Sequence, residues 1–344
     1  MIHEVELGLD TFGDITAGSD GTPIAAAQVI RDVVEEAVLA DELGIDFIGV
    51  GEHHRDDFAI SSPEMVLAAI AGRTSRIRLG SAVTVMSSDD PVRVFQRFAT
   101  LDAVSSGRAE IIVGRGSFTE SFPLFGYDLA DYEVLFEEKL ELFVKLLAEQ
   151  PVTWSGTTRA PLRDQAVHPP TESGRLTTWI GVGGSPASVA RAARYRLPLM
   201  VAIIGGDPAR FAPLIHRYRR TLEDDGVGRL PVGVHSPGYV AESDEQALLE
   251  LWPAMKAMRD RIGAERGWGP IRRSDFERDA GPEGSWYVGS PETVATKIAR
   301  TVSLLDLDRF DLKYSAGRLS HDRLMSSIEL YGSQVIPRVR DLLS

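Results

Sequence analysis

The sequence of 344 residues contains no cysteine. Disulfide bridges, thiolate metal ligands and cysteine nucleophiles are therefore excluded. Positive charge is also scarce, because 37 Lys and Arg residues stand against 50 Asp and Glu residues and the net charge is -13. Such a chain repels phosphate backbones and anionic lipids, so we expect neither nucleic acid nor a membrane as a partner. A local basic pocket for a single phosphate stays compatible with this balance.

Long apolar runs are missing as well. No run reaches the length that a membrane-spanning helix requires. The first residues, MIHEVELGLDTFGD, carry acidic side chains and lack the basic stretch and apolar run of a signal peptide. We therefore expect a cytoplasmic protein. With 43% apolar and 25% charged residues, the composition is that of a globular protein with a sizeable core.

Short β-rich runs alternate with amphipathic helical patterns along nearly the whole chain, which is typical of βα units. The expected strands are 5–9, 47–51, 77–85, 110–113, 178–182, 199–204, 232–240 and 310–314. The expected helices are 26–43, 63–73, 92–104, 131–147, 186–195, 208–222, 245–262 and 291–305. Eight parallel strands can close into a barrel. The sequence predicts an α/β fold, a (β/α)8 TIM barrel, with residues 1–344 forming a single domain.

Repeated helix-start signals support these helices. Proline suits the first helical turn, and a Ser or Asp before it can cap free N–H groups. The pairs are Ser62-Pro63, Asp90-Pro91, Ser185-Pro186, Asp207-Pro208 and Ser290-Pro291. Helices are therefore expected to begin at these five positions.

Two irregular segments interrupt the alternation, near residues 155–176 and 264–287. Both are rich in Gly, Pro and mixed charge, and the alternation resumes after each, so we interpret them as insertions in one barrel. The second contains Trp268 and ends near Trp286. We expect it to act as a mobile lid that excludes water from the site. The alternative is a solvent-exposed loop that has no function.

Catalytic residues of such barrels follow the carboxyl ends of the strands. Glu52, His53 and His54 follow the second strand. Adjacent side chains of a strand point to opposite faces, so the two histidines are not expected to bind one metal, and no metal site is predicted. His53 is a candidate for proton transfer near neutral pH, while His54 is either catalytic or a structural residue held by Glu52. A metal-dependent hydrolase that uses these histidines with Asp10 or Glu52 is the least favoured alternative.

Two glycine-rich turns could bind a phosphate. The first is Gly114-Arg115-Gly116-Ser117, where the guanidinium fork can grip an anion, although it could equally pair with a carboxylate. The second, Gly183-Gly184-Ser185-Pro186, leads into a helix, whose N-terminal N–H groups attract anions, although a simple tight turn would look the same. Its glycine spacing fails the dinucleotide fingerprint. Small residues at Ser81–Thr84 would let a flat ligand lie on the third strand, or would merely pack the barrel.

Taken together, these segments resemble the bacterial luciferase-like monooxygenase family of flavin-dependent enzymes. The resemblance covers nearly the whole chain. It rests on Glu52-His53-His54, residues 90–116, the stretch 122–126, the turn 183–186 and the stretch 288–292.

The resemblance implies roles for individual residues. His53 would be the catalytic histidine beside the reactive edge of the flavin ring. The flavin phosphate would lie at Arg115, Gly116 and Ser117, together with Gly183, Gly184, Ser185 and Ser188. Ala82 and Val83 would be joined by a cis peptide under the ring. Gly184 and Gly114 stand where luciferase has glutamate and cysteine, so aldehyde bioluminescence is not implied.

The implied activity is that of a flavin-dependent monooxygenase. Reduced FMN from a separate flavin reductase and O2 would oxygenate a small organic substrate, and the chain would form a homodimer. A deazaflavin-dependent reductase or dehydrogenase and a non-catalytic flavin-binding barrel are the alternatives. The expected substrate pocket is lined by Phe12, by His3 or Asp10, and by Met86 and Phe118.

Overall fold

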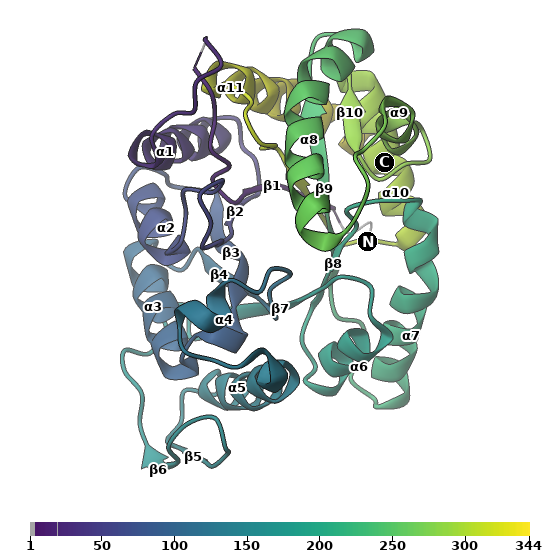
Figure 1. The fold of residues 1–344 in the computed structure, drawn as a ribbon. Helices are drawn as coiled ribbons and strands as arrows, with labels where there is room; N and C mark the ends of the chain where they lie inside the picture. Colours follow the sequence, from purple (N-terminus) through teal and green to yellow (C-terminus); the bar gives the residue numbers. More distant parts are fainter. Residues whose placement is uncertain (1–3, 19) are drawn as a thin grey trace.

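A closed barrel forms the centre of the computed structural model, which describes residues 4–18 and 20–344. Within that part of the chain, eight parallel strands follow one another around the barrel, and the last pairs with the first. They are β1 (Glu6–Thr11), β2 (Phe47–Val50), β3 (Arg78–Val85), β4 (Ala109–Gly114), β7 (Thr177–Val182), β8 (Leu199–Ala202), β9 (Val232–Val240) and β11 (Arg309–Lys313). The predicted TIM barrel is confirmed (Figure 1).

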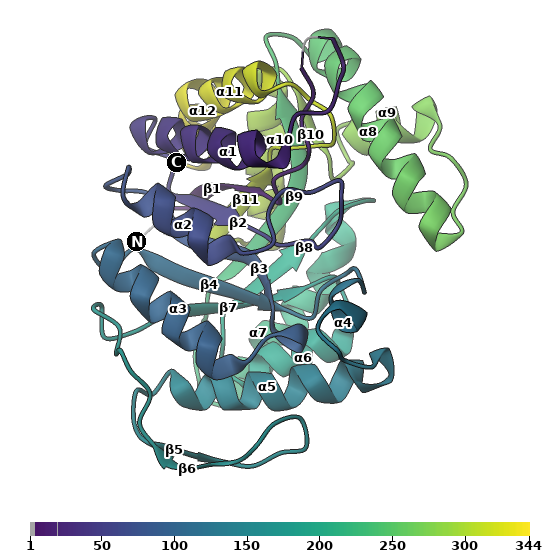
Figure 2. The same ribbon diagram turned by 60° about the vertical axis from the view of Figure 1, so that its left-hand side comes forward.

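Helices surround this barrel (Figures 1 and 2). They are α1 (Ala26–Glu42), α2 (Pro63–Ala71), α3 (Pro91–Val104), α5 (Tyr132–Leu146), α6 (Pro186–Arg194), α7 (Ala212–Asp224), α8 (Asp244–Arg266), α10 (Pro291–Leu305), α11 (His321–Leu330) and α12 (Ile336–Leu343). Shorter elements include the helix α4 (Ser121–Leu124) and the 3-10 turns η1 (Met86–Ser88), η2 (Leu129–Asp131) and η3 (Pro208–Phe211). All five predicted proline starts are confirmed, with η3 at Pro208 leading into α7. Among the described residues, no helix has the length and apolarity needed to cross a membrane.

The C-terminal helices were not predicted. A π turn, η4 (Tyr331–Val335), joins α11 to α12. Such a turn inserts an extra residue into the helical repeat, so the apolar spacing of 3.6 residues is lost where the two helices meet. Tyr331 and Val335 are nevertheless fully buried, so this π turn packs against the rest of the protein.

The two irregular segments adopt different structures. The first is mostly irregular but contains β6 (Leu162–Gln165), which pairs antiparallel with β5 (Val152–Trp154) on the outside of the barrel beyond α5 (Figure 2). The second contains the last turn of α8, the helix α9 (Arg273–Ala280) and the start of β10 (Tyr287–Gly289), which adds to β9. The second segment lies at the same end of the barrel as α4 and the carboxyl ends of the strands (Figure 2).

Side chains fill the interior of the barrel below its carboxyl end. Phe47, Ile112, Trp179 and Met200 form a small apolar cluster there. Arg309 lies among them with its side chain 0% exposed, and its Nη1 donates to Glu110 Oε1 at 2.7 Å. Because a buried charge is tolerated only when it is paired, this ion pair completes a packed floor below the carboxyl ends of the strands.

Candidate active site

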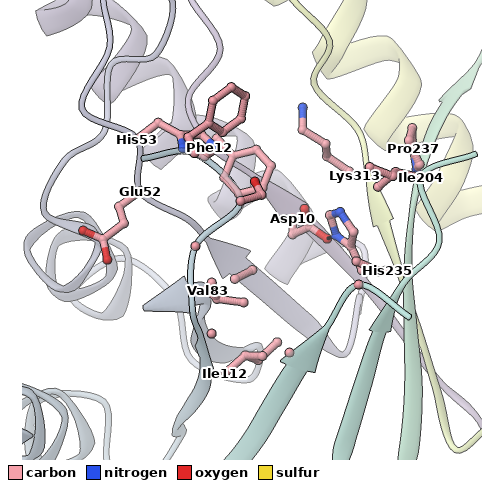
Figure 3. Close-up of a pocket in the computed structure, with 18 of the residues that line it drawn as sticks. Asp10, Phe12, Glu52, His53, Val83, Ile112, Ile204, His235, Pro237 and Lys313 are labelled. Atoms are coloured by element: carbon pink, nitrogen blue, oxygen red, sulfur yellow. Dashed lines mark hydrogen bonds and ion pairs between the residues drawn. The ribbon is translucent and has the colours of Figure 1, made fainter. Parts of the chain in front are cut away.

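A cavity of about 470 Å³ opens at the carboxyl ends of the strands. Its wall includes residues that follow β1, β2, β4 and β7, together with one face of α8. Figure 3 shows Phe12 and His53 on one side of this cavity and His235, Ile204 and Pro237 on the other. The volume lies within the range of small-molecule and cofactor sites.

A ledge formed by Ala82 and Val83 crosses the floor of the cavity. The peptide bond between them is cis, as the family resemblance predicts, and the β3–β4 register shifts at this point. Glycines make room for the Val83 side chain, because a Cβ at Gly114 would lie 2.7 Å from Val83 Cγ2 and one at Gly181 would lie 2.9 Å from Val83 Cγ1. Both contacts are shorter than carbon atoms tolerate. The glycines are therefore required for this flat, apolar surface.

His53 lies in an aromatic cage beside this ledge. Its ring centroid is 4.8 Å from that of Phe12, 4.6 Å from Phe58 and 4.7 Å from Phe118, and the residue is 8% exposed. Its Nδ1 lies 3.4 Å from Glu120 Oε1. Burial raises the pKa of Glu120, but hydrogen bonds from His53 and from backbone N–H groups lower it by more. The net pKa lies below the ordinary value, so this carboxylate stays charged. The arrangement holds the imidazole in one orientation with its other nitrogen, Nε2, left for a ligand.

His54 has a different environment. It is not among the described residues that line the cavity, and its ring packs edge-on against Phe125 at 5.0 Å. Its Nε2 lies 3.3 Å from Glu52 Oε2, and this interaction raises the pKa of His54. The other oxygen of Glu52 accepts a 2.6 Å hydrogen bond from the backbone N–H of Val85. His54 therefore contacts Glu52, whose carboxylate links the loop after β2 to the end of β3. A direct catalytic role for His54 stays a prediction.

Arg115 and Ser188 form the polar end of the cavity. The guanidinium donates to Ser188 Oγ at 3.2 Å, and it also pairs with Glu133 and stacks on the ring of Tyr132. Ser188 is 4% exposed. The Tyr132 hydroxyl donates to the Gly116 carbonyl at 2.9 Å, which fixes the turn that contains Gly116 and Ser117. Of the two alternatives for Arg115, the pairing with a carboxylate is the one seen here, and that carboxylate, Glu133, is exposed and also pairs with Arg191.

The second glycine-rich turn lies beside this group. Gly184 has a φ of +97°, and a Cβ there would come within 3.0 Å of the Phe211 ring, so glycine is required. At Gly183 a Cβ would meet no atom of the described chain within 4 Å, which leaves the turn open toward the cavity. Ser185 precedes α6 without capping it through a side-chain hydrogen bond to any described residue. Gly183 and Ser188 line the cavity, whereas Gly184 and Ser185 lie behind that surface.

These features fit a phosphate. The buried Ser188 hydroxyl, the Arg115 fork and the uncapped N-terminus of α6 all lie around the space that Gly183 leaves open. A phosphate prefers such a combination of a charged fork and free helical N–H groups. The site therefore suits a cofactor with a phosphate at this end and a flat ring on the ledge.

Several lining residues were not predicted. Met255, Met258, Arg259 and Ile262 of α8 face the cavity, and Trp286 joins them. Their helical spacing is visible in the sequence but looks the same as an ordinary core stripe. Trp286 is 1% exposed and donates to the Ile204 carbonyl at 2.9 Å, so it is built into the wall. The lid motion expected for 264–287 stays a prediction.

The predicted substrate residues have mixed outcomes. Phe12, Asp10 and Phe118 line the cavity as expected. Met86 is 0% exposed within the hydrophobic core, so its prediction is wrong, because the chain turns inward at η1 after β3. His3 lies outside the described residues. His235 and Lys313 line the cavity and were not predicted.

Ion pairs hold α8 across the mouth of the cavity. Arg55, in the loop after β2, donates to Glu265 at 2.6 and 2.7 Å and to Asp57 Oδ1 at 2.9 Å. Arg266 donates to the Ser117 carbonyl at 3.0 Å, and both Arg55 and Arg266 lie over the Phe118 ring. We call Arg55, Asp57, Glu265 and Arg266 the latch. It joins the end of α8 to the loops that carry His53 and Ser117.

Comparisons with known proteins agree with this fold. The chain is 33% identical to limonene 1,2-monooxygenase of Rhodococcus erythropolis over 85% of its length and 78% of that protein. Its fold matches the oxygenating constituent of 3,6-diketocamphane monooxygenase of Pseudomonas putida, solved with FMN, with a TM-score of 0.77 at 18% identity over 98% and 99% of the two chains. It also matches an F420-dependent secondary alcohol dehydrogenase, with a TM-score of 0.75 at 17% identity over 98% and 99%.

The family assignment rests on a broader match. The model of the luciferase-like monooxygenase family matches residues 11–307. This range contains all the barrel strands except β11 and all but the last residue of β1. The chain therefore belongs to the luciferase-like monooxygenase family.

Proposed function

We propose that this protein is the oxygenating component of a two-component, FMN-dependent monooxygenase. The observation that carries the proposal is one cavity with two ends, in which the Arg115–Ser188 group fits a phosphate and His53 stands beside a flat ledge. Reduced FMN, when bound, supplies the electrons that activate O2. Reduced FMN would come from a separate flavin reductase, because the glycine-rich turn lacks the dinucleotide fingerprint.

The residues of the polar end bind and orient. Arg115 would exchange Glu133 for the cofactor phosphate, keeping its hydrogen bond to Ser188. Gly183, Gly184 and Ser185 would present backbone N–H groups at the start of α6, with Gly116 and Ser117 on the other side. A phosphate held in this way fixes the distance to the ledge formed by Ala82 and Val83. The ring would then lie next to His53.

His53 would hold and move the proton. Glu120 faces its Nδ1, so Nε2 is the nitrogen that exchanges a proton with the reacting centre. Phe12, Phe58 and Phe118 surround the imidazole and would limit its proton exchange with bulk water. His54 would support this site indirectly, through Glu52 and the end of β3.

Parallel binding titrations test the cofactor. FMN and the deazaflavin cofactor F420 are each titrated into the purified chain, with riboflavin as the control that lacks a phosphate. We expect FMN to bind more tightly than riboflavin, because only FMN engages Arg115. Saturation by F420 at far lower concentration than FMN would reassign the protein to deazaflavin-dependent hydride transfer.

Rapid mixing tests whether the barrel is catalytic. The complex with reduced FMN is mixed with oxygenated buffer, and the return of oxidised-flavin absorbance is compared with that of free reduced FMN. We expect a slower return in the complex, because the enclosed site controls the reaction with O2. Reoxidation as fast as in free solution would support a non-catalytic flavin-binding barrel.

A further inference from the structure

Arg259, on the cavity face of α8, has no part in the function proposed so far. Its side chain lines the cavity and is partly buried. It makes no hydrogen bond or ion pair with any described residue, and its Nε is buried without a hydrogen-bond partner there. Its guanidinium lies over the ring of Trp268, with 5.4 Å between Cζ and the ring centroid. The positive charge of Arg259 is therefore not neutralised within the described chain.

The sequence of α8 explains why Arg259 is unpaired. Residues three and four positions away on a helix are neighbours on its surface. For Arg259 these neighbours carry no negative charge, and they are Met255, Lys256, Ile262 and Gly263. Asp260, next along the chain, pairs with Lys256 instead. No carboxylate of its own helix is therefore available to Arg259.

The other charged groups that line the cavity each have a partner among the described residues. The pairs are Arg115–Glu133, Lys313–Asp14, Asp10–His235, Glu52–His54, Asp311–Arg309 and His53–Glu120. Within the described chain, Arg259 is the charged lining residue that lacks one. Removing a charge from water costs free energy, and a nearby opposite charge offsets that cost. A ligand with an anionic group would supply the missing partner.

The surroundings of Arg259 are apolar inside the cavity and exposed at its rim. Met255, Met258 and Ile262 line the cavity from the same helix, whereas Trp268 is 48% exposed. A ligand held by Arg259 would therefore place its charged group near the rim and an apolar body inside.

We propose that Arg259 binds the carboxylate of an apolar organic acid, which is the substrate of this site. The planar guanidinium fork matches the two oxygens of a carboxylate. One unpaired cation also balances one negative charge, whereas a phosphate dianion would bring a second charge without a partner. This inference deepens the proposed function, on which it rests, because it names the substrate class that the monooxygenase would take.

Matched ligands test the proposal. Cyclohexanecarboxylate and cyclohexanecarboxamide have nearly the same shape, but only the first is charged at neutral pH. Their dissociation constants are measured by ligand-observed NMR with wild type, Arg259→Gln and Arg259→Lys, all without flavin. Wild type should prefer the carboxylate, and this preference should fall about tenfold in Arg259→Gln, the loss of one hydrogen bond between charged groups. Arg259→Lys should recover part of the preference, because it restores the charge but not the fork.

Lys256→Gln is the matched control. It removes the same charge from the same helix, three positions before Arg259, and Lys256 is not among the described residues that line the cavity. It should leave the preference unchanged. An equal fall in Lys256→Gln would overturn the proposal, because the effect would then come from the net charge of the helix. So would a wild type without any preference, or an unchanged preference in Arg259→Gln when its melting temperature shows that it is folded.

Arg115→Ala separates the two cationic positions of the cavity. The carboxylate preference should persist in this variant, and its loss would overturn the proposal by placing the carboxylate at the Arg115 end. The same variant compares the carboxylate with cyclohexanesulfonate and cyclohexyl phosphate. Both should bind less tightly, because the sulfonate spreads its charge over three oxygens and the phosphate carries a second charge. Tighter binding of either would overturn the assignment to carboxylic acids. None of these measurements uses FMN, so failure of the FMN titration is a separate result.

Discussion

The two ends of the cavity are lined by different kinds of residue. The Arg115 end joins a cation, a buried hydroxyl and an open helix N-terminus, whereas the His53 end is an imidazole among aromatic rings. The first arrangement suits an anion, and the second suits a group that would move a proton away from bulk water. In the proposed function, affinity and chemistry are therefore carried by separate groups of residues. Substitutions at the two ends should affect different measurements.

The largest effect is expected at the His53 end. His53→Ala should reduce single-turnover oxygenation about 100-fold, the low end of general acid–base contributions, while the dissociation constant of FMN stays nearly unchanged. The measurement is product formed per bound FMN, with any substrate that wild type accepts.

His54→Ala is the matched comparison for that variant. Because His54 stands behind Glu52, its loss should reduce the rate by less than His53→Ala does. If His54→Ala proves the more severe, the proton transfer belongs to His54. If FMN affinity collapses in His53→Ala and chemistry per bound FMN does not change, His53 is a structural residue.

The next effect belongs to the Arg115 end. Arg115→Ala should weaken FMN binding by about 1.5 to 3 kcal/mol, the range for a hydrogen bond to a charged group, with little change in chemistry per bound FMN. Glu133→Gln should have the opposite sign and tighten FMN binding, because it removes the carboxylate that now pairs with Arg115. Isothermal titration measures both. Unchanged FMN affinity in Arg115→Ala would remove Arg115 from the phosphate site.

The sequence predicts the parts of this molecule that depend on local chemistry. Pro63, Pro91, Pro186 and Pro291 begin helices because proline suits the first turn wherever it occurs. The eight strands and the position of His53 at a strand end follow from the βα alternation in the same way.

Features that depend on distant parts of the chain could not be predicted. His235 meets Asp10 only because β9 and β1 lie on either side of β11 in the closed barrel, although the two residues are 225 positions apart in sequence. The cavity face of α8 has the spacing of a core stripe, and only the tertiary structure shows that Met255 and Ile262 face open space. The latch likewise joins Arg55 to Glu265 across 210 residues.

The latch gives a smaller effect, shared by both ends of the cavity. Arg55→Ala should free the last turn of α8, because it removes the bidentate contact with Glu265. Glu265 is partly exposed, so we expect about 1 kcal/mol, or roughly fivefold faster amide exchange around residues 259–268. Hydrogen exchange followed by mass spectrometry measures this. Arg278→Ala, which removes an exposed ion pair on α9, is the control. Equal exchange in Arg55→Ala and wild type would show that packing alone holds α8.

The smallest expected effects come from two serines in the same local sequence, Gly-Ser-Pro. Ser290 caps α10, since its hydroxyl accepts from the Thr293 N–H, whereas Ser185 makes no such bond to the described chain at the start of α6. Ser290→Ala should therefore lower the free energy of unfolding by about 0.5 to 1 kcal/mol and leave FMN binding unchanged. Ser185→Ala should leave stability unchanged and weaken FMN binding about threefold, one modest hydrogen bond to the phosphate. Urea unfolding and FMN titration on both variants complete the comparison. If Ser185→Ala loses stability as Ser290→Ala does, its hydroxyl is a helix cap, and the phosphate is held by Arg115, Ser188 and the backbone alone.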